Sequence, residues 1–228
     1  MLKFEEYVYE RPVLHEEQVT FKELLKKFTD AQSAEEAISA TESINAFRNR
    51  LSTLYNLVYI RASIDTKDEF YQQERDFFDE IQPNLKEMNT EFYKELVSSS
   101  FRNNLEKQFG SQFFQLVDKE IKAFSPEIIS LLQKENKLAS EYSKLVASAE
   151  VAFQGETYTL AQLAPFAQSK DREIRKQAIT ANAHFFESHA DQFDSIYDQL
   201  VKVRHEIALK LGYKNFVEVG YLRMQRID

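Results

Sequence analysis

Apolar residues recur every three or four positions along most of the chain, the spacing that places them on one face of an α-helix. The longest such stripe runs from Ser33 to about Ile64, and Ser33 with Glu36 predicts a capping box at its start. A second stripe follows over 66–98, with Thr66 as its expected cap and Pro83 inside it as an expected kink or break. We expect the two segments to pair antiparallel through an aromatic-rich interface.

Caps and breakers predict shorter helices on either side of this pair. An arm over 1–15 lacks helical periodicity, and a helix from Thr20 to about Asp30 follows it. The last helix should start at Asn215 and run into the C-terminus, with Gly220 marking close packing against another helix. The remaining expected helices cover Ser100–Gly110, 111–124, Ser125 to about Ala149, 170–188 and 191–211.

The helical pattern is interrupted once. Val151-Ala152-Phe153 and Glu156-Thr157-Tyr158-Thr159 flank Gln154-Gly155, which predicts a β-hairpin whose two-residue turn needs the positive φ of Gly155. Thr159 and Gln162 predict a capping box for a short helix that Pro165 limits. The expected fold class is therefore all-α: a multi-helix antiparallel array with long helices, about three quarters helical, and one short β-hairpin near 150–159.

Composition narrows the classes of partner and environment. The 228 residues carry a formal net charge of −8, which disfavours nucleic acid and anionic membrane as partners. Cysteine is absent, which excludes disulfides and thiolate zinc ligands. The N-terminus has no apolar signal-peptide core, and no run approaches the roughly 18 apolar residues of a membrane span. We expect a soluble, cytoplasmic protein.

The histidines do not form a pattern that binds zinc. A zinc peptidase helix of the H-E-x-x-H type needs a second histidine four residues after the first. His205-Glu206 is followed by Leu209 at that place, and His15-Glu16 also lacks a second histidine. His184 and His189 are five residues apart and diverge on a helix. We expect no catalytic, cofactor-binding or metal-binding residue in this chain, and we expect all four histidines to be surface or packing residues.

Several segments in order resemble one family of peptidases. The run FQGETYTLAQL followed by SKDREIRKQA resembles the hinge region of oligoendopeptidase F, a zinc metallopeptidase related to thimet oligopeptidase. Upstream, SSSFRNNLEKQFG and SPEIISLLQKENKLASEYSKLVASAEVAF resemble the N-terminal domain of that family. Downstream, IYDQLVKVRHEIALKLGYKNFVEVGYLRMQR resembles the opening of its peptidase domain.

The resemblance implies a division of the chain and a function for its parent protein. Residues 1–168 would be the helical N-terminal region, and 169–228 the truncated start of the peptidase domain. The parent would hydrolyse oligopeptides with a zinc ion whose ligands lie outside this chain, which would form one wall of the substrate channel and be inactive alone. Residues 191–228 would pack against the remainder of the peptidase domain or self-associate. The alternative is a non-catalytic helical interaction module or scaffold.

Overall fold

The computed structural model describes residues 3–227 and shows an all-α fold, 78% helical, with one two-stranded antiparallel hairpin, as predicted. Short 3₁₀ turns lie at Phe4–Glu6 (η1) and Pro126–Ile128 (η2). The helices are α1 (Leu14–Thr29), α2 (Ala34–Ile64), α3 (Glu69–Ser98), α4 (Arg102–Phe109), α5 (Ser111–Lys122), α6 (Ile129–Ala147), α7 (Leu160–Ala167), α8 (Arg172–Ser188), α9 (Ala190–Lys210) and α10 (Phe216–Arg223), and the strands are β1 (Val151–Phe153) and β2 (Glu156–Tyr158).

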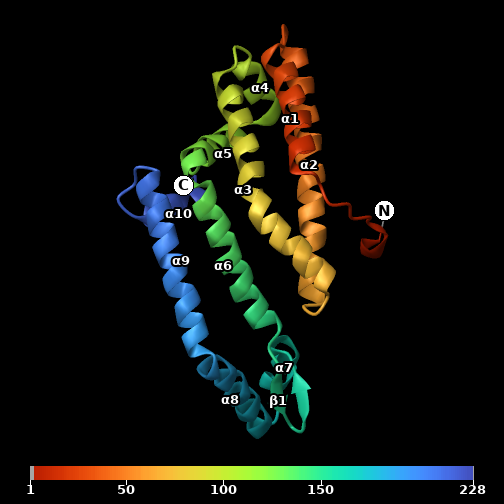
Figure 1. The fold of residues 1–228 in the computed structure, drawn as a ribbon, viewed down its shortest axis with the longest axis vertical. Helices are drawn as coiled ribbons and strands as arrows, with labels where there is room; N and C mark the ends of the chain where they lie inside the picture. Colours follow the sequence, from red (N-terminus) through yellow and green to blue (C-terminus); the bar gives the residue numbers. More distant parts are fainter. Residues whose placement is uncertain (1–2, 228) are drawn as a thin grey trace.

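The helices form an open, elongated array (Figure 1). The first three lie side by side, with α4 and α5 packed at one end of them, and α6 runs between α3 and α9. The hairpin, α7 and α8 lie at the far end of the molecule, where the chain turns from α6 back along α9. The last helix returns to α5, so segments about 100 residues apart in sequence meet near the middle of the array.

The expected pairing of the two longest helices is confirmed, and α1 packs against both of them. Their shared core is rich in aromatic side chains, and Phe28 meets Phe92 edge to face with ring centroids 5.5 Å apart. The largest fully buried members of this core are Phe21, Ile44, Phe92, Leu96, Leu105 and Phe114.

Among the described residues three smaller cores complete the fold, and one of them, around Val58, Phe78 and Ile81, packs against Tyr9 of the N-terminal arm. Another joins α6 and η2 to α9 and α10 around Ile128, Ile207 and Val219. The third holds the hairpin against α7 and α8. Within the hairpin Val151 pairs with Tyr158, and the turn residues Gln154 and Gly155 both have positive φ, 51° and 86°, as a two-residue hairpin turn requires.

The structure corrects the start of the first helix. It begins at Leu14 rather than Thr20, and no side chain caps it. The sequence pattern hides the first turns because a carboxylate, Glu17, occupies a buried position there. Its charge is matched by an ion pair with Arg50 on α2, so a polar residue substitutes for the apolar one that the pattern requires.

Two caps also differ from prediction. The cap of α3 is Asp68, whose Oδ1 accepts from the Tyr71 amide at 3.1 Å, and Thr66 lies outside the helix. At the start of α2 the Ser33 hydroxyl accepts from the Glu36 amide as expected. The Glu36 carboxylate, however, accepts from the Gln32 amide at 2.7 Å, so the second half of the capping box is displaced by one residue.

The last helix is shorter than predicted. It ends at Arg223, and the next two residues, Met224 and Gln225, turn the chain, with Gln225 at a φ of 55°. A Cβ added at Gly220 would touch only the ring of Phe216, one turn earlier, at 3.7 Å. Gly220 therefore does not mark close packing against another helix.

Pro83 does not break α3, because α6 supplies the hydrogen bonds that a proline removes. Proline has no amide hydrogen, so the Asp79 carbonyl, four residues before Pro83, loses its helical partner, and the next carbonyl, that of Glu80, is disturbed by the proline ring. The side-chain amide of Asn136 donates to the Asp79 carbonyl at 3.2 Å, and that of Gln133 donates to the Glu80 carbonyl at 2.9 Å. The helix therefore continues through the proline to Ser98.

Candidate functional site: a cationic cavity between the helices

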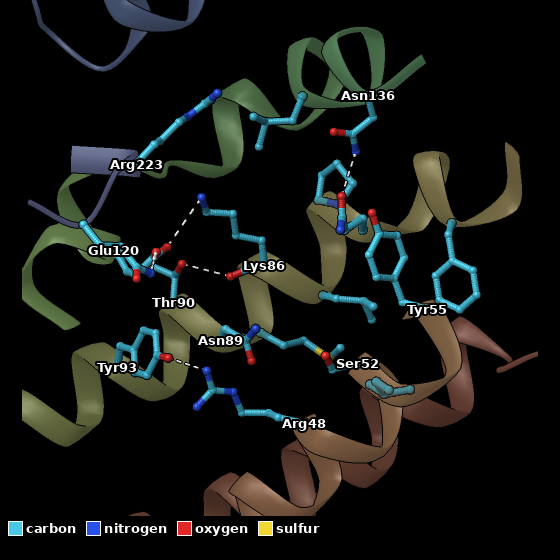
Figure 2. Close-up of a pocket in the computed structure, with 18 of the residues that line it drawn as sticks. Arg48, Ser52, Tyr55, Lys86, Asn89, Thr90, Tyr93, Glu120, Asn136 and Arg223 are labelled. Atoms are coloured by element: carbon cyan, nitrogen blue, oxygen red, sulfur yellow. Dashed lines mark hydrogen bonds and ion pairs between the residues drawn. The ribbon is translucent and has the colours of Figure 1, made fainter. Parts of the chain in front are cut away.

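A cavity of about 670 Å³ lies where α2, α3, α5, α6, α9 and α10 meet. This volume falls within the usual range for small-molecule sites. Its charged lining consists of Arg48, Lys86, Glu120, Glu135, Arg204 and Arg223. Figure 2 shows four of these residues, Arg48, Lys86, Glu120 and Arg223, which come from four different helices.

Lys86 extends from the middle of α3 into this space (Figure 2). Burial lowers the pKa of its ammonium, and the nearby carboxylate of Glu120 only partly opposes that effect. The Lys86 Nζ lies 3.5 Å from Glu120 Oε2, and the other oxygen of that carboxylate accepts from the Gln225 amide at 3.0 Å. The cavity thus holds a cation whose charge is incompletely compensated.

Glu135 joins two arginines at the other side of the cavity. It lies on the buried face of α6, and its carboxylate accepts from Arg204 Nε at 2.7 Å and from Arg223 Nη1 at 2.8 and 3.0 Å. Both guanidinium groups also lie over the ring of Phe216. A single buried carboxylate therefore fixes α9 and α10 onto α6, and one positive charge is left in excess.

Arg48 and Tyr93 close the cavity from below in Figure 2. The Arg48 guanidinium lies over the ring of Tyr93, 4.8 Å from its centroid, and donates to the Tyr93 hydroxyl. Tyr55, on the same helix as Arg48, also lines the cavity. Burial, followed by the negative charge of Asp79, raises the pKa of the Tyr55 hydroxyl, so Tyr55 stays a neutral hydrogen-bonding group.

The uncharged part of the wall mixes apolar and polar side chains. Phe78, Pro83, Leu85, Leu116 and Leu132 are among its apolar members, and Ser52, Gln82, Asn89, Thr90, Asn136 and Gln225 are among its polar ones. Apolar side chains beside a few convergent charges suit recognition of a charged group attached to an apolar body.

The histidines lie apart from this cavity and from one another. His15, His184 and His205 are exposed on α1, α8 and α9. His189 ends α8, where its ring stacks on Phe185 and its Nδ1 lies 2.8 Å from the Phe185 carbonyl oxygen. Over residues 3–227 no group of three or more histidine, aspartate or glutamate side chains is placed to hold a metal ion.

Sequence patterns did not reveal the cavity. Its charges come from positions as far apart as Arg48 and Arg223, and only the packing of six helices brings them together. One local signal was available, because Glu135 interrupts the apolar stripe of Leu131, Leu132 and Leu138 on α6. A carboxylate at a buried position predicts a buried cationic partner, although it does not say which one.

Comparison with known proteins gives one family. A model of the peptidase M3 N-terminal domain matches residues 4–124. Solved structures with the same fold include PZ peptidase A with an inhibitor, 53% identical, a protein assigned as an oligoendopeptidase F, 49% identical, and a second such protein from Bacillus anthracis strain Ames, 46% identical. Each superposes with a TM-score of 0.95 over 99–100% of this chain.

The likeness covers part of those proteins. The chain spans 40%, 40% and 42% of the three solved chains, in the order given. Among curated proteins none matches the chain. Among the helices of the described part, none has the combination of length and apolar composition needed to cross a membrane.

Proposed function

Because the chain belongs to the family of the peptidase M3 N-terminal domain, we propose that it is the N-terminal part of an oligoendopeptidase F-like zinc metalloendopeptidase that hydrolyses oligopeptides. The observation that carries this proposal is the fold match, at about half sequence identity and a TM-score of 0.95 over essentially the whole chain. That match covers the whole chain and so extends beyond the matched domain at 4–124 into the helices after the hairpin.

In this proposal the chain forms one wall of the substrate channel and contributes no zinc ligand. The zinc ion and the catalytic groups belong to the part of M3 peptidases that the chain does not span. The division into a helical N-terminal region, 1–168, and the start of the peptidase domain, 169–228, is part of the same proposal. So are the inactivity of the chain on its own and a cytoplasmic location.

The exposed apolar residues of the last three helices and of the residues that follow them support a further contact in the parent protein. Large apolar side chains are at least 40% exposed at Ile179, Phe186, Tyr197, Val201, Leu209, Val217, Tyr221, Met224 and Ile227. Since the solved relatives are more than twice as long as the chain, we propose that these residues pack against the remainder of the peptidase domain. Self-association of the isolated chain is the competing outcome.

The test begins with the reading frame after Asp228. We expect it to encode an H-E-x-x-H helix, and the longer protein should bind one zinc ion and cleave a quenched peptide in a chelator-sensitive way. Replacing the first histidine of that motif by alanine should abolish both properties. His205→Ala is the matched control, since His205 is exposed and lacks a partner histidine, and activity should stay within about twofold.

Two results would contradict the proposal. A stop codon directly after Asp228, with a stable monomeric product, would favour the non-catalytic interaction module. Tight stoichiometric zinc or chelator-sensitive cleavage by the 228-residue chain alone would show that the assignment of zinc to the missing part is wrong.

A further inference from the structure

We propose that the cavity between α3, α6 and α10 binds a small organic carboxylate with an apolar body. The chain as a whole has a net charge of −8, yet the cavity lining carries four cations and two carboxylates, a net charge of +2. The cations of this lining repel one another, and an anion bound among them offsets that repulsion.

The cationic side chains have hydrogen-bonding capacity that the described chain does not use. Arg223 Nε and Nη2 and Arg48 Nε are buried and have no acceptor among residues 3–227. The Lys86 ammonium has three donors, and its ion-pair partner Glu120 lies at the long distance of 3.5 Å. Buried donors in native proteins are normally satisfied, so unused donors on two residues of the lining favour an acceptor bound between these helices.

The charge and shape of the cavity favour a carboxylate over a phosphate. Glu120 and Glu135 already occupy part of the lining, so a dianion would meet two negative charges at close range. The lining contains no glycine, and therefore no backbone loop of the kind that cradles phosphate. A monoanionic carboxylate matches the forked donors of an arginine and the ammonium of a lysine.

The apolar side chains of the lining favour an apolar body attached to the carboxylate. Phe78, Leu85 and Leu132 face the same space as Lys86, so an aliphatic or aromatic body can be buried while its carboxylate meets the cations. Two sources offer this chemistry: the free C-terminus of a short peptide with apolar side chains, and an aliphatic acid. Binding needs neither zinc nor the part of M3 peptidases outside the chain, so the proposal stands apart from the proposed peptidase activity.

Isothermal titration calorimetry on the 228-residue chain tests the proposal. The probes are N-acetyl-Phe-Leu with a free carboxylate, its C-terminal amide, octanoate and inorganic phosphate. We expect one of the two organic carboxylates to bind with a Kd below about 1 mM, and the amide and phosphate to bind about tenfold more weakly or not at all. The tighter of the two acids identifies the source.

Three variants localise the site. Lys86→Met keeps the apolar stem and removes a charge whose burial is unfavourable, so the protein should fold, and binding should weaken about tenfold. Glu120→Gln removes a competing carboxylate and should strengthen binding several-fold. Lys137→Met is the matched control, because Lys137 also makes an ion pair between α6 and α3, with Glu80, but lies outside the cavity lining.

The outcomes separate cleanly. The proposal is supported if Lys86→Met weakens binding of the acid, Glu120→Gln strengthens it, and Lys137→Met leaves it unchanged. Equal binding of acid and amide, binding of phosphate as tight as that of either acid, no binding of either acid, or an unaltered affinity in Lys86→Met would each overturn it. None of these results depends on whether the longer protein cleaves peptides.

Discussion

Asp79 offers a test of the electrostatics at the contact between α3 and α6. Its side chain is 8% exposed, and its Oδ2 is buried with no hydrogen-bond partner among the described residues. Burial raises the pKa of this carboxyl from 3.8 to about 6, although a hydrogen bond to Ser140 and the charge of Arg75 oppose the rise. At neutral pH the folded protein therefore holds an ionised carboxylate that would be better hydrated in the unfolded chain.

The sign of the pH dependence follows from linkage. The folded pKa lies above the unfolded one, so the folded state binds more protons between pH 4 and 6, and the carboxyl reduces stability progressively as pH rises through that window. A pKa difference of about 2 corresponds to about 3 kcal/mol. Asp79 also lines a small cavity of about 170 Å³ that has room for water, and water there screens its charge. We therefore expect the ionised carboxylate to lower the free energy of unfolding by about 1–2 kcal/mol rather than by the full amount.

Asp79→Asn should therefore stabilise the chain by about 1–2 kcal/mol at pH 8 and by much less at pH 4. Urea unfolding followed by circular dichroism at both pH values measures the difference, with an unchanged m-value as the check for two-state behaviour. Asp76→Asn is the control, since Asp76 is exposed on the same helix and should change stability by less than about 0.5 kcal/mol. A loss of stability in Asp79→Asn at pH 8, or an equal gain at both pH values, would refute the reasoning.

Three further predictions concern packing and buried polar contacts. Phe92→Ala should lower the free energy of unfolding by about 3–5 kcal/mol because the ring is fully buried, whereas Phe70→Ala, at a half-exposed ring of the same helix, should cost far less in the same urea titration. Glu135→Ala should lower the free energy of unfolding by about 3–5 kcal/mol because it leaves two arginines without their shared carboxylate. Glu135→Gln should recover part of that stability. If thermal unfolding shows equal losses for the two variants, the charge of Glu135 has no role. Asn136→Ala should lower the free energy of unfolding by about 1 kcal/mol, because the Asp79 carbonyl loses its partner. The loss should be smaller in a Pro83→Ala background, where the amide of residue 83 can donate to that carbonyl. Additive effects in a double-mutant cycle would show that the two residues are not coupled.

Helices and hairpin were predictable because their signals are local. The stripe from Ser33 to Ile64 and the turn at Gln154-Gly155 appear in the structure almost where the sequence places them. The local sequence pattern gave the wrong prediction where a side chain from a distant part of the chain compensates for an unfavourable residue. Glu17 is buried because Arg50 reaches it from the next helix, and α3 passes through Pro83 because Asn136 reaches it from α6.

The cavity could not be predicted in the same way. No spacing in the sequence connects Lys86 with Arg223, and the two meet only because α10 folds back onto α5 and α9. What the sequence does contain is charged residues at buried helical positions, of which Glu135 is the clearest. Such residues indicate that a polar site exists, while its location depends on the tertiary packing.

The two amides that α6 extends to the carbonyls around Pro83 also set the lengthwise position of one helix on the other. A slide of α6 by one turn, about 5.4 Å, would bring Leu132 or Ser140 to the place of Asn136. Leucine has no donor, and serine is too short to replace the amide, so the Asp79 carbonyl would lose its partner. Apolar helix faces tolerate sliding, but this pair has one favourable alignment. An insertion or deletion in the segment between α3 and α6 should therefore be absorbed by α4 and α5, leaving the α3–α6 alignment unchanged.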